Sequence, residues 1–258
     1  TVSGTYSVTA GGVVSDSGDL DIEGATTILA SGSNVVLDRA THDFTGAVGV
    51  TGAAVELVDA NGIDLGASTV SGTYAVTATT GDISNSGNLV ITGAATFITT
   101  AADSNIILDQ SGNAFTSTVT MQAGDGSADF GNITFVDSAA VRLHTSAQLA
   151  GDLYINAGTD GAVGGALSVT ANGDITQTVA LAVTGTTTLV AGGNDITLDT
   201  STNNFATVVI TSGRNVALRD EDAIVLGAST VSGTYGITAD GNITDDGTQE
   251  ITGVTTLV

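Results

Sequence analysis

Two acidic turns contain the residue types that could bind a metal ion. They are Asp59, Asn61 and Asp64 in VDANGID and Asp220, Glu221 and Asp222 in RDEDA. Ca²⁺ prefers several oxygen ligands of this kind. However, the chain has neither an EF-hand loop nor the glycine- and aspartate-rich nonapeptides of a calcium β-roll. Because Asp and Asn are also ordinary turn residues, we expect turns without a bound ion and predict no metal site.

One region could gather an acid/base pair for catalysis. Asp152 and Asp160 lie near Arg142 and His144 in the sequence, and paired carboxylates are the groups that hydrolyse glycosidic bonds. The chain has no lysine, and its four arginines are scattered. We therefore expect exposed loop residues here, and we predict no catalytic residue and no cofactor. We also expect His42, in a turn before a phenylalanine, to be solvated.

Two sets of aromatic residues recur, and we assign both to the core. The first set could stack on sugar rings, but its position is taken by Leu167 in one copy and has the same inward parity as the neighbouring valines. The second follows three aspartates by six residues and predicts another internal ladder. The sets are Tyr6, Tyr74 and Tyr235, and Phe44, Phe115 and Phe205. A threonine run, Thr186 to Thr188, suggests ice binding, but outward positions elsewhere are too irregular for that function.

One ten-residue sequence motif, the repeated phrase, occurs three times along the chain. TVSGTYSVTA begins at Thr1, TVSGTYAVTA at Thr69 and TVSGTYGITA at Thr230, and the clearest spacing is 68 residues, from Val8 to Val76. A unit of this length must contain several strands. Stacked copies of one unit predict a solenoid.

Within each unit, apolar and polar residues alternate in short runs that Gly, Asn, Asp and Ser interrupt. This pattern is typical of strands and turns and predicts essentially no helix. Equivalent runs show which residues face inward. The inward set includes Val35, Leu37, Ile106, Leu108, Ile196 and Leu198. Gln249 occupies an inward position held elsewhere by Leu20, Leu89 and Leu181. Either it finds a buried partner or the last coil deviates there, and we expect the deviation.

The strand count favours a right-handed parallel β-helix with three faces and roughly 11 coils, each of about 23 residues. A β-sandwich would not require a phrase to return every 68 residues. We predict one β-solenoid segment, residues 1–258, with units at roughly 1–68, 69–161, 162–229 and 230–258. The second unit is longer, which suggests an added coil. The chain starts and stops within a repeat, so we expect it to be part of a longer protein, with end coils that continue or associate.

Composition excludes several functions. The formal net charge of −23 opposes binding to nucleic acid or to anionic membranes, because both need clustered Lys and Arg. No apolar run is long enough to span a bilayer, so we expect no membrane insertion. The absence of cysteine excludes disulfides and thiolate chemistry.

The run GDITQTVALAVTGTTTLVAGGNDITLDTSTNNF resembles the repeats of filamentous-haemagglutinin-type exoproteins, which are secreted by the two-partner route. The resemblance extends over nearly the whole chain, although the family's secretion domain is not visible. It implies a right-handed β-helical fibre on a bacterial surface, with roles in adhesion and biofilm formation.

Two functions follow as hypotheses. The first is a non-enzymatic structural segment of a secreted cell-surface fibre or extracellular filament. Its partners would be further coils of the same protein, like subunits end to end, and host or matrix glycans. The second is a carbohydrate-binding or polysaccharide-processing β-helix that uses the region from Asp125 to Gly165.

Overall fold

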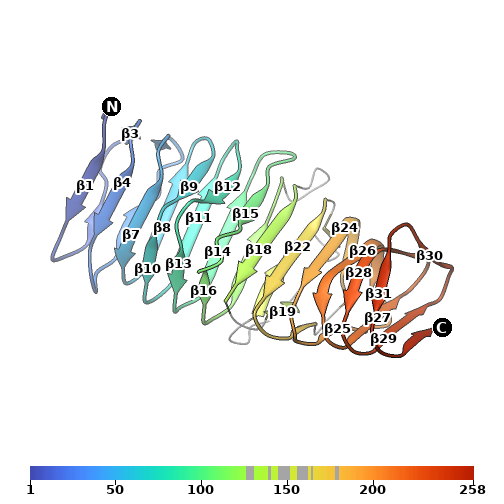
Figure 1. Ribbon diagram of the computed structural model, residues 1–258. Helices are drawn as coiled ribbons and strands as arrows, with labels where there is room; N and C mark the ends of the chain where they lie inside the picture. Colours follow the sequence, from blue (N-terminus) through green and yellow to red (C-terminus); the bar gives the residue numbers. More distant parts are fainter. Residues whose placement is uncertain (126–130, 139–140, 145–151, 156–161, 164, 178–179) are drawn as a thin grey trace.

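The chain is a parallel β-solenoid of about 11 turns (Figure 1). The computed structural model describes residues 1–125, 131–138, 141–144, 152–155, 162–163, 165–177 and 180–258. These residues form 32 strands and no helix, and the pairing is parallel from coil to coil. The predicted fold class is thereby confirmed.

The strands belong to sheets of 17, 13 and two strands. The 17-stranded sheet contains β1 (Tyr6–Thr9), β4 (Thr26–Leu29), β7 (Val48–Gly52), β9 (Ile63–Leu65), β10 (Ser68–Val70), β12 (Ile83–Asn85), β13 (Leu89–Ile91), β15 (Ile106–Leu108), β16 (Ala114–Phe115), β18 (Ile133–Asp137), β21 (Ala162–Val163), β22 (Leu167–Ala171), β24 (Ala182–Val190), β26 (Asn204–Gly213), β28 (Ile224–Val231), β30 (Ile243–Asp245) and β31 (Gln249–Ile251). The 13-stranded sheet contains β2 (Val14–Ser15), β5 (Val35–Leu37), β8 (Val55–Asp59), β11 (Tyr74–Ala78), β14 (Ala95–Thr99), β17 (Val119–Gln122), β19 (Val141–His144), β20 (Asp152–Ile155), β23 (Ile175–Gln177), β25 (Ile196–Leu198), β27 (Val216–Asp220), β29 (Tyr235–Ala239) and β32 (Thr255–Leu257). The two-stranded sheet contains β3 (Asp21–Ile22) and β6 (Asp43–Phe44).

The alternation of the sequence determines which side chains enter the core. Every second residue of a strand points to the same face, and the six residues predicted to face inward are at most 3% exposed. They are Val35, Leu37, Ile106, Leu108, Ile196 and Leu198. Between them, Val36, Ile107 and Thr197 are half-buried on the outer surface. The predicted parity of the strands is confirmed.

One coil carries three strands, as β11, β12 and β13 show between Tyr74 and Ile91. In the 13-stranded sheet the register runs from Val14 through Val35, Val55 and Tyr74 to Ala95, so successive coils there contain about 20 residues, close to the length expected of a β-helical turn. Three such coils are shorter than the 68-residue spacing of the repeat. A unit of 68 residues therefore advances by three coils and one additional strand.

This advance moves the repeated phrase from one sheet to the other. The strands β1 and β22 belong to the 17-stranded sheet, while the equivalent β11 and β29 belong to the 13-stranded sheet. The inward parity of the phrase is the same in both places, because Tyr74, Leu167 and Tyr235 are all buried. The same sequence thus fits either sheet of the solenoid.

The longer second unit contains an additional strand layer. Between β1 and β11 the 13-stranded sheet has β2, β5 and β8, but between β11 and β22 its described strands are β14, β17, β19 and β20. The extra strand is β20, which lies between β17 and β19. In the 17-stranded sheet β18 pairs directly with β22, so the described strands show an inserted strand and not the complete added coil that the length suggested.

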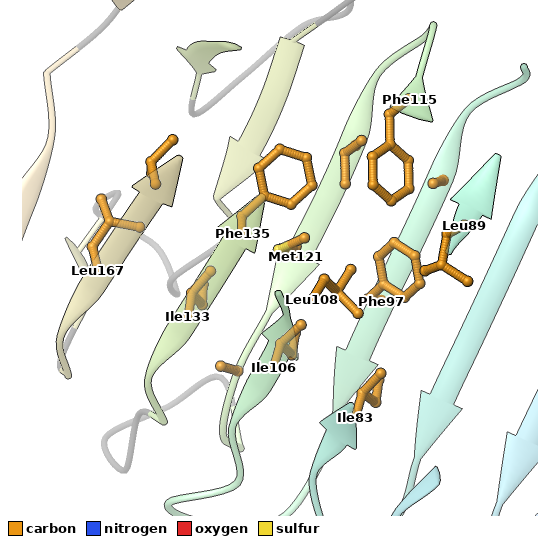
Figure 2. Packing of buried hydrophobic residues seen from close by; sticks show 14 of the residues in the cluster. Ile83, Leu89, Phe97, Ile106, Leu108, Phe115, Met121, Ile133, Phe135 and Leu167 are labelled. Atoms are coloured by element: carbon orange, nitrogen blue, oxygen red, sulfur yellow. The ribbon is translucent and has the colours of Figure 1, made fainter. Parts of the chain in front are cut away.

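Aromatic side chains form part of the core from β11 to β18, and Figure 2 shows the phenylalanines of β14, β16 and β18 among them. The ring centroids of Tyr74 and Phe97 are 5.8 Å apart, those of Phe97 and Phe115 are 6.2 Å apart, and those of Phe115 and Phe135 are 5.3 Å apart. The first two pairs meet edge to face, an arrangement that adds favourable electrostatics to apolar burial. Of the predicted core aromatics, only Tyr6 is half-buried.

Some corners of the solenoid require glycine because successive coils approach closely. A Cβ built on Gly46 would lie 2.5 Å from the carbonyl carbon of Gly24, and a Cβ on Gly24 would lie 2.5 Å from that of Gly4. No side chain fits at such a distance. The three glycines therefore allow the first coils to stack at this corner.

The expectation that the last coil deviates at Gln249 was wrong. It stays in register with Ser229 of the preceding coil. Its side-chain amide donates hydrogen bonds to the carbonyls of Gly227, at 2.8 Å, and Gly247, at 3.1 Å. A polar residue is tolerated in an inward position because main-chain acceptors lie within its reach.

Candidate functional site

The acidic turns that were considered as possible calcium ligands contain carboxylates that hydrogen-bond the main chain. The Asp59 carboxylate is fully buried and accepts the N–H groups of Phe44 and Asn61, each at 2.7 Å. Burial raises the pKa of Asp59, while the two main-chain hydrogen bonds oppose that shift. The carboxylate therefore acts as a fixed acceptor inside the solenoid.

Asp220 repeats this arrangement in the last third of the chain. Its carboxylate is also fully buried and accepts the N–H of Phe205 at 2.7 Å and that of Asp222 at 3.1 Å. Burial likewise raises the pKa of Asp220. In the intervening unit, Asp137 accepts the N–H of Phe115 at 3.4 Å. A buried aspartate thus follows each of the three repeated phenylalanines.

A second buried polar position lies two residues before each of these phenylalanines. It is occupied by His42, Asn113 and Asn203, all fully buried. Each accepts the N–H of a leucine in the preceding coil at 2.9 Å, and the three leucines are Leu20, Leu89 and Leu181. The expectation that His42 is solvated was wrong, because the ring takes the place of an internal asparagine.

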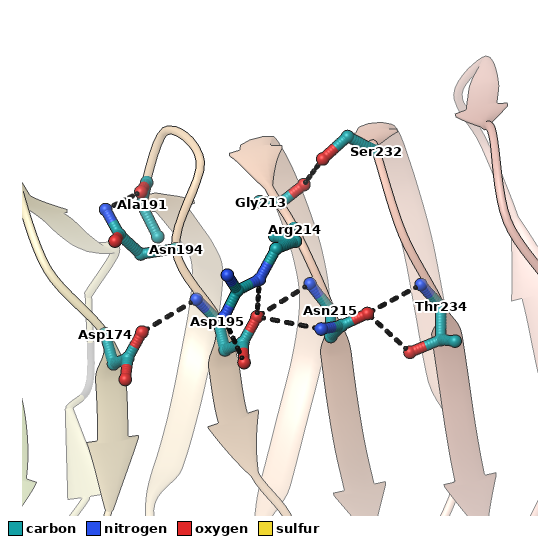
Figure 3. A network of polar contacts seen from close by, with 9 residues as sticks. All are labelled: Asp174, Ala191, Asn194, Asp195, Gly213, Arg214, Asn215, Ser232 and Thr234. Carbon is teal, nitrogen blue, oxygen red and sulfur yellow. Dashed lines mark hydrogen bonds and ion pairs between the residues drawn. The ribbon is translucent and has the colours of Figure 1, made fainter.

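Asp and Asn side chains also form ladders along the corners (Figure 3). The Asp174 carboxylate accepts the N–H of Asp195 at 2.9 Å, Asp195 accepts that of Asn215 at 3.1 Å, and Asn215 accepts that of Thr234 at 3.1 Å. Each acceptor lies one coil before its donor. The side chains satisfy N–H groups at the beginning of successive strands.

Arg214 joins this ladder from the solvent side. Its Nε and one terminal nitrogen donate to the two carboxylate oxygens of Asp195 at 2.7 and 2.8 Å. These hydrogen bonds lower the pKa of Asp195 to about 2. A similar ladder joins Asp82, Asn105 and Asn132 on the 17-stranded sheet.

The cationic groups that the structure describes are engaged with carboxylates. Arg39 contacts Asp16 at 2.6 Å, and Arg219 lies 3.5 Å from Asp240. Both pairs are at least partly exposed to solvent on one side. Together with Arg214, these arginines neutralise acidic positions on the surface of the solenoid.

The residues considered for acid/base catalysis lie in the second unit. The register of β19 and β20 places Arg142 opposite Asp152 on neighbouring strands. His144 is opposite Tyr154, and Asp160 lies outside the described residues. No site geometry follows from these main-chain positions.

The acidic surface does not assemble a metal-binding cluster in the part of the chain that the structure describes. One surface hollow is open to solvent and is lined in part by Asp64, Asp82 and Asp103. Two of these carboxylates already accept N–H groups of the next coil, Asp64 from Ser86 and Asp82 from Asn105. Of the threonine run, only Thr186 is exposed, since Thr187 is buried and Thr188 is half-buried.

The polar ladders were not predicted, although the sequence contains a signal for them. Each ladder residue directly precedes an inward aliphatic residue, as in Asp195–Ile196 and Asn215–Val216. The buried aspartates and asparagines have a fixed spacing from the repeated phenylalanines, so the same alignment could have identified them.

Comparison with known proteins gives one match. A family model described as repeats of unknown function (DUF5649) matches residues 1–51, 52–122, 130–212 and 213–258, nearly the entire chain. No curated protein and no solved structure matches it. Over the described residues, the structure contains no helix long and apolar enough to cross a membrane.

Proposed function

The chain belongs to the family of repeats of unknown function (DUF5649), and from this premise we propose that it is a structural segment of a secreted bacterial cell-surface fibre or extracellular filament. In this proposal the chain has no enzymatic role. It supplies length, stiffness and a repetitive surface, as the repeats of filamentous-haemagglutinin-type exoproteins do.

The observation that carries the proposal is the use of buried polar groups. Asp59, Asp220, Asn113 and Asn203 are all fully buried, and each accepts main-chain N–H groups of other coils or of its own turn. A catalytic or ligand-binding carboxylate would need to face a cleft. Here the polar side chains complete the hydrogen bonding of the stack, which supports a structural role.

The architecture also suits extension. In a solenoid each coil contacts only its neighbours, so coils can be added without rebuilding a central core. Further coils of the same protein, or like subunits end to end, are therefore the partners that we propose. The charge of −23 keeps such a surface soluble and opposes unspecific lateral association.

The proposed function includes adhesion and matrix formation. Glycans of a host or of the matrix are the proposed ligands, and the extracellular cell surface is the proposed location. The alternative of a carbohydrate-processing enzyme depends on the region from Asp125 to Gly165. Among the described residues of that region, no contact favours it over the structural role.

Immunogold electron microscopy tests the proposal on the cells that produce the protein. Antibodies raised against residues 1–258 should label extended extracellular filaments, and genetic deletion of repeat units should shorten them.

The matched strains carry Leu108→Asp, which disrupts the core, and Ile107→Asp, which changes the adjacent outer position. The first should lose filaments and the second should retain them. Label confined to the cytoplasm, or polysaccharide cleavage by the purified chain, would contradict the proposal.

A further inference from the structure

His42 differs chemically from its two equivalents in the same internal position. Asn113 and Asn203 accept a leucine N–H through an amide oxygen, which has no proton to gain at ordinary pH. His42 accepts the N–H of Leu20 through Nδ1 at 2.9 Å. This hydrogen bond exists only while Nδ1 carries no proton, so one of the three positions depends on the protonation state of a side chain.

The hydrogen bond fixes the tautomer of the ring. Since Nδ1 is the acceptor, the proton of the neutral ring is on Nε2. Nε2 has no hydrogen-bond partner and points toward Asp16, whose Oδ1 lies 3.5 Å away. A second proton would have to bind Nδ1, where it would face the N–H of Leu20.

Charged groups lie near the ring, but the acceptor of the Leu20 N–H is Nδ1 of His42 itself. Oδ2 of Asp16 pairs with Nε of Arg39 at 2.6 Å, so this carboxylate is already engaged with a cation. The ring is also fully buried and lies 5.7 Å from the ring of Phe44. Asp16, after β2, lies against Nε2, and Asp59, at the end of β8, interacts electrostatically with the ring. The charged groups next to these two carboxylates are Arg39, which also lies near Asp19, and Asp43 in β6.

We propose that His42 makes the coil around Leu20 an acid-sensitive latch, which opens when Nδ1 is protonated, while the equivalent asparagine positions stay closed. Protonation removes the acceptor of the Leu20 N–H and places two N–H groups against each other in a buried site. An unsatisfied buried donor is costly. Loss of the hydrogen bond between His42 and Leu20 in mild acid would open this coil near one end of the described stack. The proposal does not depend on the filament function.

Amide hydrogen exchange of the intact protein tests the latch with an internal control. Protection factors of the amides of Leu20, Leu89 and Leu181 are measured at about pH 7.5 and about pH 5, which bracket the usual titration of histidine. The factor for Leu20 should fall by about tenfold or more relative to the other two. His42→Asn should abolish this difference, and His144→Asn, which removes the chain's other histidine, should leave it unchanged.

A second measurement keeps the proposal testable if His42→Asn fails to fold. In the unaltered protein at neutral pH, ¹⁵N chemical shifts of the His42 ring should show Nδ1 unprotonated and Nε2 protonated. Nδ1 carrying the proton at neutral pH would overturn the proposal. Equal protection of Leu20, Leu89 and Leu181 at both pH values, or an undiminished acid response in His42→Asn, would also overturn it.

Discussion

The carboxylate of Asp59 hydrogen-bonds the main-chain N–H of Phe44 at 2.7 Å. Phe44 belongs to β6, which pairs with β3 of the preceding coil. The N–H of Phe44 is accepted by a side chain, the carboxylate of Asp59. Asp220 and Phe205 repeat the contact at the same distance. At both places a buried aspartate therefore provides the acceptor for a phenylalanine N–H.

Replacing Asp59 by alanine should destabilise the protein. Asp59→Ala leaves the N–H groups of Phe44 and Asn61 without their acceptor, and an unsatisfied buried donor costs about 1–3 kcal/mol. Urea unfolding followed by circular dichroism measures the loss. Asp240→Ala is the control, because it removes a carboxylate from an exposed pair with Arg219 and should cost well under about 1 kcal/mol. Equal losses in both variants would contradict a buried capping role.

The same carboxylate should affect the pH dependence of stability. Its pKa in the folded protein is raised above 3.8 by burial, so folding takes up a proton at Asp59. The stabilising contribution of that proton is complete below pH 3.8 and is lost as the pH rises through the folded pKa. Unfolding free energies measured from acid to neutral pH should fall less steeply in Asp59→Ala than in the unaltered protein. Parallel curves would show that Asp59 does not titrate differently on folding.

Asp195 should show the opposite sign. Hydrogen bonds from Arg214 lower its pKa from 3.8 to about 2, so its contribution is present above pH 3.8 and is lost as the pH falls toward 2. Because the pair is exposed, solvent screens the effect and it should be small. Arg214→Met should reduce the acid-induced loss over this range in unfolding measurements at low salt. An unchanged loss would mean that the pair contributes nothing measurable.

The parity of the strands can be tested at two adjacent residues. Leu108 is fully buried and Ile107 is half-buried on the outer surface. Leu108→Asp places a carboxylate without a partner in the core and should cost about 3 kcal/mol or more. Ile107→Asp should cost less than about 1 kcal/mol. Urea melts that rank the two variants in the opposite order would contradict the assignment of the faces.

The glycine corner gives a steric prediction. Gly46→Ala would place a Cβ 2.5 Å from the carbonyl carbon of Gly24, whereas a Cβ on Gly18 meets nothing within 4 Å. Gly46→Ala should therefore lower the melting temperature clearly, and Gly18→Ala should leave it nearly unchanged or raise it slightly through lower chain entropy. Similar melting temperatures for the two variants would show that the first coils do not pack as closely as described.

Much of the fold could be predicted because apolar residues alternate at a fixed period. The equivalences between Val35, Ile106 and Ile196 identified inward positions correctly. The sheet in which each strand lies could not be predicted in this way, because the inward parity of TVSGTY is the same in β1 and β11 although the sheets differ. Register against a neighbouring coil depends on turn lengths that the repeat alone does not determine.

The polar interior was harder to predict than the apolar core. A fully buried Asp59 and a half-buried Asp64 both occur in the segment VDANGID, and composition does not separate them. Their roles depend on which N–H groups of other coils face them, Phe44 for Asp59 and Ser86 for Asp64. His42 shows the same limit, since a turn residue in sequence becomes an internal acceptor only after the coils stack.

Cryo-electron microscopy of the native protein, purified from the cells that produce it, tests the proposed structural role most directly. We predict an extended rod in which residues 1–258 form stacked coils with an axial spacing of about 4.8 Å, continuous with further coils or with like subunits. A compact particle in which these residues surround a substrate-filled cleft would contradict the proposal.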